Sequence, residues 1–216
     1  MKIISHFSSN IKARWIKTAI CLTKNLEKLG YKVSIFKTAA DAAKYLDSEI
    51  DGKTVGFGGS VTLEDMGLYD MLTKHNEVYW HHITKDPAEK EFQRKNAAVA
   101  DVYLSSVNGI AETGEIINID GTGNRVASTI YGHKKVYFVV GKNKMAPDYD
   151  SALWRARNIA SPMNAKRLNR KTPCAISGHC HNCNSPDRIC CSLNVLWFKP
   201  LYSEYEVVLV EEDMGY

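Results

Sequence analysis

Apolar residues recur along the chain first at helical and then at strand spacing. The helical spacing comes first, at Ile16, Ile20, Leu26 and Leu29. Ser8, Ser9 and Asn10 are candidate N-caps for this helix, and Gly30 is a candidate stop. Residues 31–36 then alternate between apolar and polar positions, which predicts a strand directly after the helix.

The same alternation of helix and strand continues through most of the chain. Strands are predicted at residues 54–57, 78–80, 102–105 and 135–140, and helices at 41–48, 62–75, 86–100 and about 149–160. Thr62 with Asp65 resembles a capping box, and Asp86-Pro87 supplies an N-cap followed by an N1 proline. This rhythm predicts an α/β fold, with a mostly parallel sheet, helices on both faces and ligands beyond the carboxyl ends of the strands.

The rhythm is interrupted after Ser106. Residues 112–115 are typical of a turn between the short apolar runs 109–111 and 116–119, which predicts a hairpin. Near the end of the chain, residues 195–198 and 206–210 are expected to close the sheet. The prediction is a single domain over residues 1–216, with a basic, cysteine-rich loop at 164–191 inside it.

Composition favours a single globular domain and argues against a membrane-spanning or secreted protein. The chain has 216 residues, 44% of them hydrophobic, which suffices for one sizeable core. No window approaches the roughly 18 apolar residues that span a bilayer, and the N-terminus lacks the apolar run of a signal peptide. We therefore expect a cytoplasmic protein without membrane insertion.

The net charge of +4 is concentrated just before the cysteines, at Lys166, Arg167, Arg170 and Lys171. A nucleic-acid footprint would spread over a whole face, so no nucleic-acid partner is expected. A local basic patch of this kind can face a thiolate-bound centre, receive an anionic ligand, or simply be a solvated helix end.

Five of the six cysteines lie close together in the predicted loop. Cys174, Cys180, Cys183 and Cys190 have the spacing C-x5-C-x2-C-x6-C, and Cys191 follows as a spare ligand. Zinc would suit four cysteines or three cysteines and a histidine, His179 or His181, and an iron-sulfur cluster would suit four thiolates; the spacing does not decide between these metals. The alternative is a loop of reduced cysteines that pack as small apolar residues. Cys21, alone in the first helix, is expected in the core.

Gly58, Gly59 and Ser60 lie where a predicted strand enters a helix. Glycines at such a junction let backbone N–H groups approach an anion. The segment has no Walker A lysine and does not fit the dinucleotide fingerprint, so a plain tight turn is the alternative.

Residues 108–125 are rich in side chains that bind substrates. The candidate ligand-binding residues are Asn108, Gly121, Thr122, Gly123, Asn124 and Arg125, and the candidate catalytic carboxylates are Glu112 and Asp120. The alternative is a hairpin followed by a helix that Thr122 or Asn124 caps, with Arg125 paired to Asp120. His81, His82 and His133 are interpreted as surface or core histidines.

Several segments together resemble the lactate-utilisation (LUD) domain family. They are residues 55–63, 106–115, 118–127, 139–144, 157–165 and 212–216, so the resemblance covers nearly the whole chain. It implies a Rossmann-like fold related to ribose-phosphate isomerases, CoA transferases and formyltetrahydrofolate cyclo-ligase. Such relatives hold phosphorylated or acyl ligands on glycine-rich loops at strand ends.

Two functions follow as hypotheses. In the first, the protein serves organic-acid, lactate-like utilisation, binds a small anionic metabolite, has a metal or iron-sulfur centre, and works with other lactate-utilisation proteins. In the second, it is a transferase- or ligase-type enzyme for a phosphorylated or CoA-linked substrate, and its cysteine loop holds a structural zinc or no metal. A regulatory module without chemistry is a third reading. The chain lacks the long cysteine arrays of the larger iron-sulfur members of the family.

Overall fold

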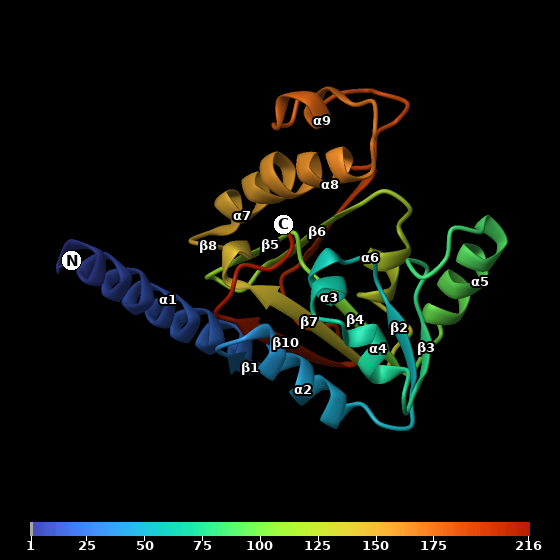
Figure 1. Cartoon of the computed structure of the whole chain (residues 1–216), viewed down its shortest axis with the longest axis horizontal. Helices are drawn as coiled ribbons and strands as arrows, with labels where there is room; N and C mark the ends of the chain where they lie inside the picture. The colour runs from blue at the N-terminus through green and yellow to red at the C-terminus, as the bar shows by residue number, and fades with distance from the viewer. Residues whose placement is uncertain (1) are drawn as a thin grey trace.

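A six-stranded parallel sheet forms the centre of the molecule (Figure 1). The computed structural model describes residues 2–216, with side chains from Trp15 onward. The strand order is β1-β10-β7-β4-β2-β3. The strands are β1 (Lys32–Phe36), β2 (Thr54–Phe57), β3 (Glu77–Tyr79), β4 (Val102–Ser106), β7 (Lys135–Gly141) and β10 (Glu204–Val210). The prediction of an α/β fold with a mostly parallel sheet is therefore confirmed.

Strand β10 lies inside the sheet, paired with β1 on one side and β7 on the other. The sequence prediction that this segment completes the sheet is correct in that β10 is the last strand of the sheet in sequence order. Its position in the sheet is nevertheless internal. Six consecutive residues of β10, from Tyr205 to Val210, are buried. A strand that is covered on both faces and flanked by two neighbours needs such a continuous run.

A second, four-stranded sheet has the order β8-β5-β6-β9. Its strands are β5 (Gly109–Ala111), β6 (Ile116–Asp120), β8 (Met145–Ala146) and β9 (Ser192–Leu196). The antiparallel pair β5–β6 confirms the predicted hairpin. Strand β9 pairs antiparallel with β6, so the prediction that residues 195–198 close the main sheet was wrong. Ser192 lies opposite Asp120, and the end of the cysteine-rich loop is thereby held at the end of β6.

Helices cover both faces of the six-stranded sheet. Helices α2 (Ala39–Glu49), α3 (Val61–Asp65) and α4 (Leu68–Leu72) contact one face, and α1 (Lys2–Lys28) and α5 (Pro87–Ala97) contact the other. Strand β7 shows how the layers meet: Tyr137 and Val139 pack with the first group, and Phe138 and Val140 pack with the second. This alternation follows from the period of two along a strand.

Helix α1 differs from its sequence prediction in its start and in its buried face. Ser8 to Asn10 lie within the helix and do not cap it. The buried positions of its described side chains are Trp15, Ala19, Leu22 and Leu26. Ile16 and Ile20 are half exposed, and Cys21 is exposed, so its placement in the core was wrong. These residues lie on the side of α1 turned away from the sheet, because the stripe 15-19-22-26 faces it.

The remaining helices begin near the predicted residues, but the single helix predicted at 62–75 was wrong: it is divided into α3 and α4 at Gly67, whose φ of 64° interrupts the helix. Ser60 caps α3 by accepting from the N–H of Leu63, whereas the sequence assigned the cap to Thr62. Asp86 caps α5 as predicted. The helix predicted at 149–160 consists of α7 (Tyr149–Arg155) and one π-helical turn (Ala156–Ala160), which continues into α8 (Ser161–Arg167). Within the described residues, no helix has an apolar stretch that would cross a bilayer.

Candidate functional site

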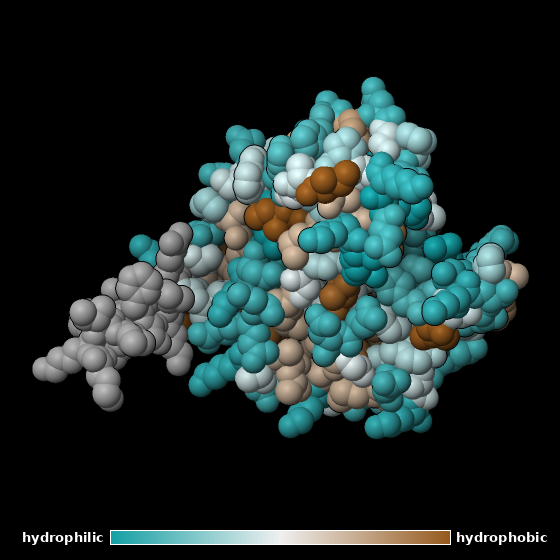
Figure 2. Space-filling view, turned by 45° about the horizontal axis from the view of Figure 1, so that its top comes forward, coloured by the Kyte–Doolittle hydropathy of each residue, from teal (hydrophilic) through white to brown (hydrophobic). Residues whose placement is uncertain are grey.

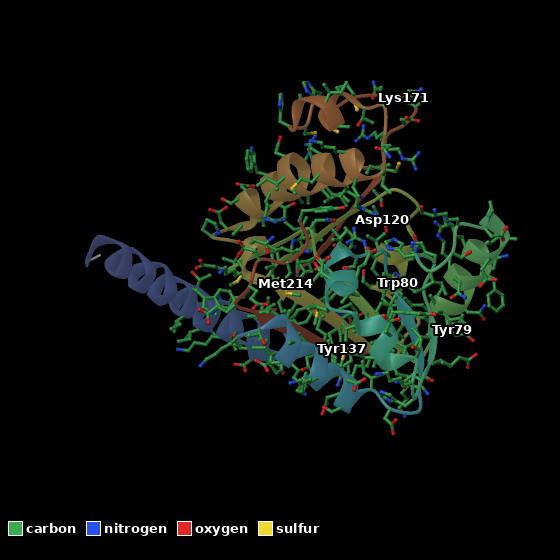
Figure 3. All side chains as sticks on the ribbon, viewed as in Figure 1. Tyr79, Trp80, Asp120, Tyr137, Lys171 and Met214 are labelled. Carbon is green, nitrogen blue, oxygen red and sulfur yellow. The ribbon has the colours of Figure 1, made fainter. Side chains whose placement is uncertain are left out.

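The candidate site is a cavity of about 510 Å³ at the carboxyl ends of the parallel strands. Because the strands of a parallel sheet all point the same way, the residues that follow β2, β3, β4 and β7 meet at one edge. Figure 3 shows Asp120 at this edge, between the sheet and α8, and Tyr137 toward the opposite end of the strands.

Basic side chains dominate the charged groups of the cavity. They are Lys85, Lys90, Arg94, Arg125, Lys144, Arg167 and Arg170. The carboxylates in the lining are Glu64 and Asp120, and the histidines are His81 and His82. Hydroxyl and amide groups come from Ser60, Thr62, Thr84, Ser106, Asn108, Thr122, Asn124 and Asn164. In Figure 2 the surface between α5 and the region of α8 and α9 (Pro173–Ser177) is correspondingly hydrophilic.

Most of the ligand-binding residues proposed from the sequence meet in this cavity. Gly59, Ser60, Asn108, Gly121, Thr122, Asn124 and Arg125 line it, together with Asp120. Gly58 and Gly123 are outside the lining. Gly123 is instead the N-cap of α6 (Asn124–Ser128), with a φ of 87°, so the alternative of a Thr122 or Asn124 cap was wrong.

Glu112 lies elsewhere, at the turn between β5 and β6. Its side chain accepts a hydrogen bond from Thr18 Oγ1 at 3.0 Å, and its carbonyl accepts one from Asn25 at 2.7 Å. Both partners are in α1, and Glu112 is not among the residues that line the cavity. The structure thus separates the two proposed catalytic carboxylates.

The glycines in the lining allow other groups to come close. A Cβ on Gly59 would lie 3.2 Å from His82 Nε2 and 3.5 Å from His81 Nε2. A Cβ on Gly121 would lie 2.8 Å from the carbonyl oxygen of Ile189, which belongs to the cysteine-rich loop. The missing side chains therefore admit the two histidines and the end of that loop to the edge of the cavity.

Arg125 connects the loops that form the floor of the cavity. Its guanidinium donates to Asn118 Oδ1 at 2.8 Å, to Asn108 Oδ1 at 2.9 Å and to the Ile119 carbonyl at 2.6 Å. Its Nε lies 3.9 Å from Asp120 Oδ2, so the predicted ion pair is confirmed. Since protein acceptors occupy the guanidinium, Arg125 fixes the shape of the site, and other cations are left to face a ligand.

Asp120 is held in a similar way. Its Oδ1 accepts from the N–H of Gly121 at 2.7 Å, and its Oδ2 accepts from the N–H of Val126 at 3.2 Å. Both oxygens are therefore engaged in the turn that joins β6 to α6. Catalysis by Asp120 and Glu112 stays a prediction.

His81 and His82 line the cavity, although surface or core positions were predicted for them from the sequence. Burial and the positive charges of neighbouring side chains lower the pKa of each to about 4. His81 Nδ1 and Arg94 Nε are buried and have no hydrogen-bond partner among the described residues. His133 is a core residue, as predicted, and its Nδ1 lies 2.7 Å from the Ala100 carbonyl oxygen.

Lys144 is the most buried charged residue of the cavity, with 3% of its surface exposed. It follows β7 in a short 3-10 turn (Lys142–Lys144). Its Nζ donates to Thr62 Oγ1 at 2.8 Å and to Ser106 Oγ at 2.9 Å. Burial, assisted by Arg155 and Arg125, lowers its pKa to about 7.

Lys144, Lys90 and Arg94 also line the cavity and were not predicted from the sequence. Each has a signal that could have found it. Lys144 follows a buried parallel strand, the position where ligands of such sheets gather. Lys90 and Arg94 are four residues apart on a predicted helix and so share one face. The basic run before the cysteines does contribute, since Arg167 and Arg170 line the cavity.

The cysteine-rich loop does not assemble a ligand set in this arrangement. Within the described residues, no three His, Cys, Asp or Glu side chains are placed to hold a metal ion. Cys174 Sγ lies 3.3 Å from Thr172 Oγ1, and Cys180 Sγ accepts from the N–H of Asn182 at 3.4 Å. The guanidinium of Arg188 donates to the carbonyls of Cys183 and Cys190, and these cysteines raise the pKa of Arg188. The sulfurs as placed do not fit a zinc or iron-sulfur site.

The fold and the site together define an α/β protein with a basic cavity at the carboxyl ends of a parallel sheet. Residues 21–210 match the LUD domain, so the chain belongs to the LUD domain family, as its sequence resemblance indicated. No curated protein matches the chain. The fold is similar to the crystal structure of a DUF162 family protein from Deinococcus radiodurans, with a TM-score of 0.52 and 12% identity. That similarity covers 91% of this chain and 98% of the other.

Proposed function

We propose that this LUD domain protein binds a phosphorylated metabolite in the cavity at the strand ends. The observation that carries the proposal is the imbalance of charge. Seven basic side chains line the cavity against two carboxylates. Among the residues that the structure describes, Arg125 is the one of the seven with a carboxylate within 4 Å. Cations that lack a counter-charge in the protein attract and hold an anion.

The size of the cavity favours a ligand larger than lactate. Its volume of about 510 Å³ lies within the range of roughly 300–1,000 Å³ in which proteins hold drug-sized ligands. A hydroxy acid of the lactate type has a single carboxylate and would leave most of the basic side chains without a partner. The many hydroxyl and amide groups of the lining suit a ligand that also has hydroxyl groups.

A thermal-shift screen tests this proposal with sugar phosphates, nucleotides, CoA esters, lactate and pyruvate. We expect phosphorylated compounds to raise the melting temperature by several degrees, because a ligand that binds the folded state alone stabilises it. The shift should decrease as salt is added, since the attraction is electrostatic. Absence of a shift with every phosphorylated compound would contradict the proposal.

Two variants test whether the ligand-induced rise in melting temperature arises from binding in the cavity. Arg94→Met and Arg170→Met remove cations from the lining and should weaken the ligand-induced shift. Lys74→Met is the matched control, because it removes the same charge from an exposed position outside the cavity. Equal loss in the control would indicate a general effect of net charge.

A lactate-like hydroxy acid is the second candidate ligand, and the family match favours it. In this case the protein would take part in organic-acid utilisation together with other lactate-utilisation proteins. Stabilisation by lactate or pyruvate, with none by phosphorylated compounds, would select this candidate. Neither candidate depends on a metal, and the centre proposed on Cys174, Cys180, Cys183 and Cys190 stays a prediction.

A further inference from the structure

The amine of Lys144, a residue that lines the cavity, has a position that its protein partners leave unused. Its two hydrogen-bond partners are the hydroxyls of Thr62 and Ser106, at 2.8 and 2.9 Å. Both hydroxyls have acceptors of their own. Ser106 Oγ donates to the Val139 carbonyl at 2.6 Å, and Thr62 Oγ1 donates to the Met214 carbonyl at 3.4 Å. The two hydroxyls therefore accept hydrogens from Lys144.

A neutral amine has two N–H groups and one lone pair. With both hydrogens donated to Thr62 and Ser106, the lone pair of Lys144 occupies the remaining tetrahedral position. Within the described residues, no other group hydrogen-bonds to this nitrogen. Lys144 belongs to the lining of the cavity.

The charges around Lys144 favour the neutral amine. Arg125 from α6 and Arg155 from α7 face it and oppose a second positive charge, while Asp65 of α3 acts in the opposite direction. Arg155 is itself fixed, because it donates to the carbonyls of Asn143 and Asn108 at 2.7 and 2.5 Å. A lysine that is buried beside other cations is a typical activated nucleophile.

We propose that Lys144 Nζ forms an imine with a carbonyl group of the anionic ligand, so that the ligands of this site include phosphorylated aldehydes or ketones. This rests on the proposed function, because the cavity's cations must hold the anion. The nitrogen lone pair adds to the carbonyl carbon, and a proton passes from nitrogen to the carbonyl oxygen. The resulting hydroxyl leaves with a second proton as water while the C=N bond forms. Amine and carbonyl thus give imine and water, without any oxidant or reductant.

Reductive trapping with pyridoxal phosphate tests the proposal on the unmodified protein. This probe combines an aldehyde with a phosphate, and borohydride converts its imine into a stable amine that peptide mapping locates. We expect label on Lys144 in preference to other lysines, with Lys142 as the neighbouring internal control. Inorganic pyrophosphate should protect Lys144, and pyridoxal without phosphate should label it more slowly. Label spread over surface lysines with none on Lys144 would overturn the proposal.

A pH series separates Lys144 from ordinary lysines. Because its pKa is about 7, its labelling should rise with pH up to that value and then level off. Labelling of an ordinary lysine should keep rising toward its usual value of 10.5. Lys144→Gln should lose the adduct, whereas Lys142→Met should keep it. A profile for Lys144 that rises without a plateau would contradict an activated amine.

The same experiment distinguishes failure of the imine from failure of the anion site. If pyrophosphate raises the melting temperature but Lys144 is never trapped, the imine is wrong and the basic cavity remains. If Lys144 is trapped equally by pyridoxal and pyridoxal phosphate, and pyrophosphate neither stabilises nor protects, the nucleophile remains and the anion site is wrong.

Discussion

Arg125 and Arg170 line the same cavity but differ in what their guanidinium groups contact. Arg125 is bound to Asn108, Asn118 and the Ile119 carbonyl inside the protein. Arg170 is exposed. A motif cannot separate these roles, because both residues are arginines in polar segments. The contacts decide that Arg125 supports the site and Arg170 is free to meet a ligand.

Replacement of Arg125 by Met should lower the free energy of unfolding by about 3 kcal/mol or more, because several buried acceptors and Asp120 would lose their donor. Urea unfolding followed by circular dichroism measures this. Arg170→Met is the control and should change stability by less than about 0.5 kcal/mol. Similar stability of the two variants would contradict the supporting role of Arg125.

His81 and His82 make stability depend on pH in a defined window. Their pKa values are lowered from 6.5 to about 4 in the folded protein. Between these values the unfolded chain binds more protons, so stability should fall as the pH decreases from 6.5 to 4. Urea unfolding at a series of pH values should give a shallower slope for the His81→Asn, His82→Asn double variant.

His75 is a control because its pKa is shifted in the opposite direction to those of His81 and His82. Asp47 and Asp51 raise its pKa above 6.5, so its contribution is present at low pH and is lost as the pH rises through that raised value. His75→Asn should therefore steepen the decline of stability toward acid pH. A steeper slope in the His81 and His82 variant would contradict the assignment of those two pKa values.

At the scale of elements, the short loops after the parallel strands build the site. Gly58 to Ser60 follow β2, Trp80 to His82 follow β3, and Lys142 to Lys144 follow β7. Their helical partners α5 and α8 contribute basic residues from outside the sheet. The cysteine-rich loop lines the cavity with Arg167 and Arg170 near its start and with Ile189 near its end, where the N–H of Cys191 donates to the Asp120 carbonyl at 2.9 Å.

The arrangement of the cysteine-rich loop predicts free thiols. Arg188 lies against Cys183 and Cys190, and the described residues contain no three-ligand cluster. After anaerobic purification we expect no stoichiometric zinc or iron and six thiols that react with Ellman's reagent under denaturing conditions. Bound metal that Cys183→Ser removes, and that Cys21→Ser leaves in place, would instead support the centre predicted from the cysteine spacing.

At the scale of the whole molecule, the order of the strands in the sheet decides which segments contribute most to stability. Strand β10 is late in the sequence but lies between β1 and β7, and its buried side chains reach both core layers. Strand β3 is at the edge of the same sheet, although it lies in the middle of the sequence.

Val208→Ala in β10 should lower the free energy of unfolding by about 2 kcal/mol, because it removes fully buried methyl groups from a packed layer. Val78→Ala in β3 makes the same chemical change at the edge, where the side chain is partly buried, and should cost less. Chemical denaturation of the two variants compares them. Equal losses would contradict the central place of β10.

The prediction of the α/β class, the β5–β6 hairpin and the cap at Asp86 from sequence succeeded because local patterns decide these features. Turn residues, caps and apolar alternation act within a few positions of the chain. The buried face of α1 was predicted wrongly, because a local apolar pattern does not show which side of a helix meets the sheet. Ile16 and Ile20 are apolar, but they are half exposed.

The sequence by itself determined the parallel α/β plan, the family, and the glycine and Asn108 to Arg125 segments as candidates for the site. Only the tertiary structure decided that β10 is central, that Glu112 is remote, and that Lys144 and the two histidines share one cavity. The physical reason is that strand order and the meeting of loops depend on contacts between residues far apart in sequence. Local spacing carries no information about such contacts.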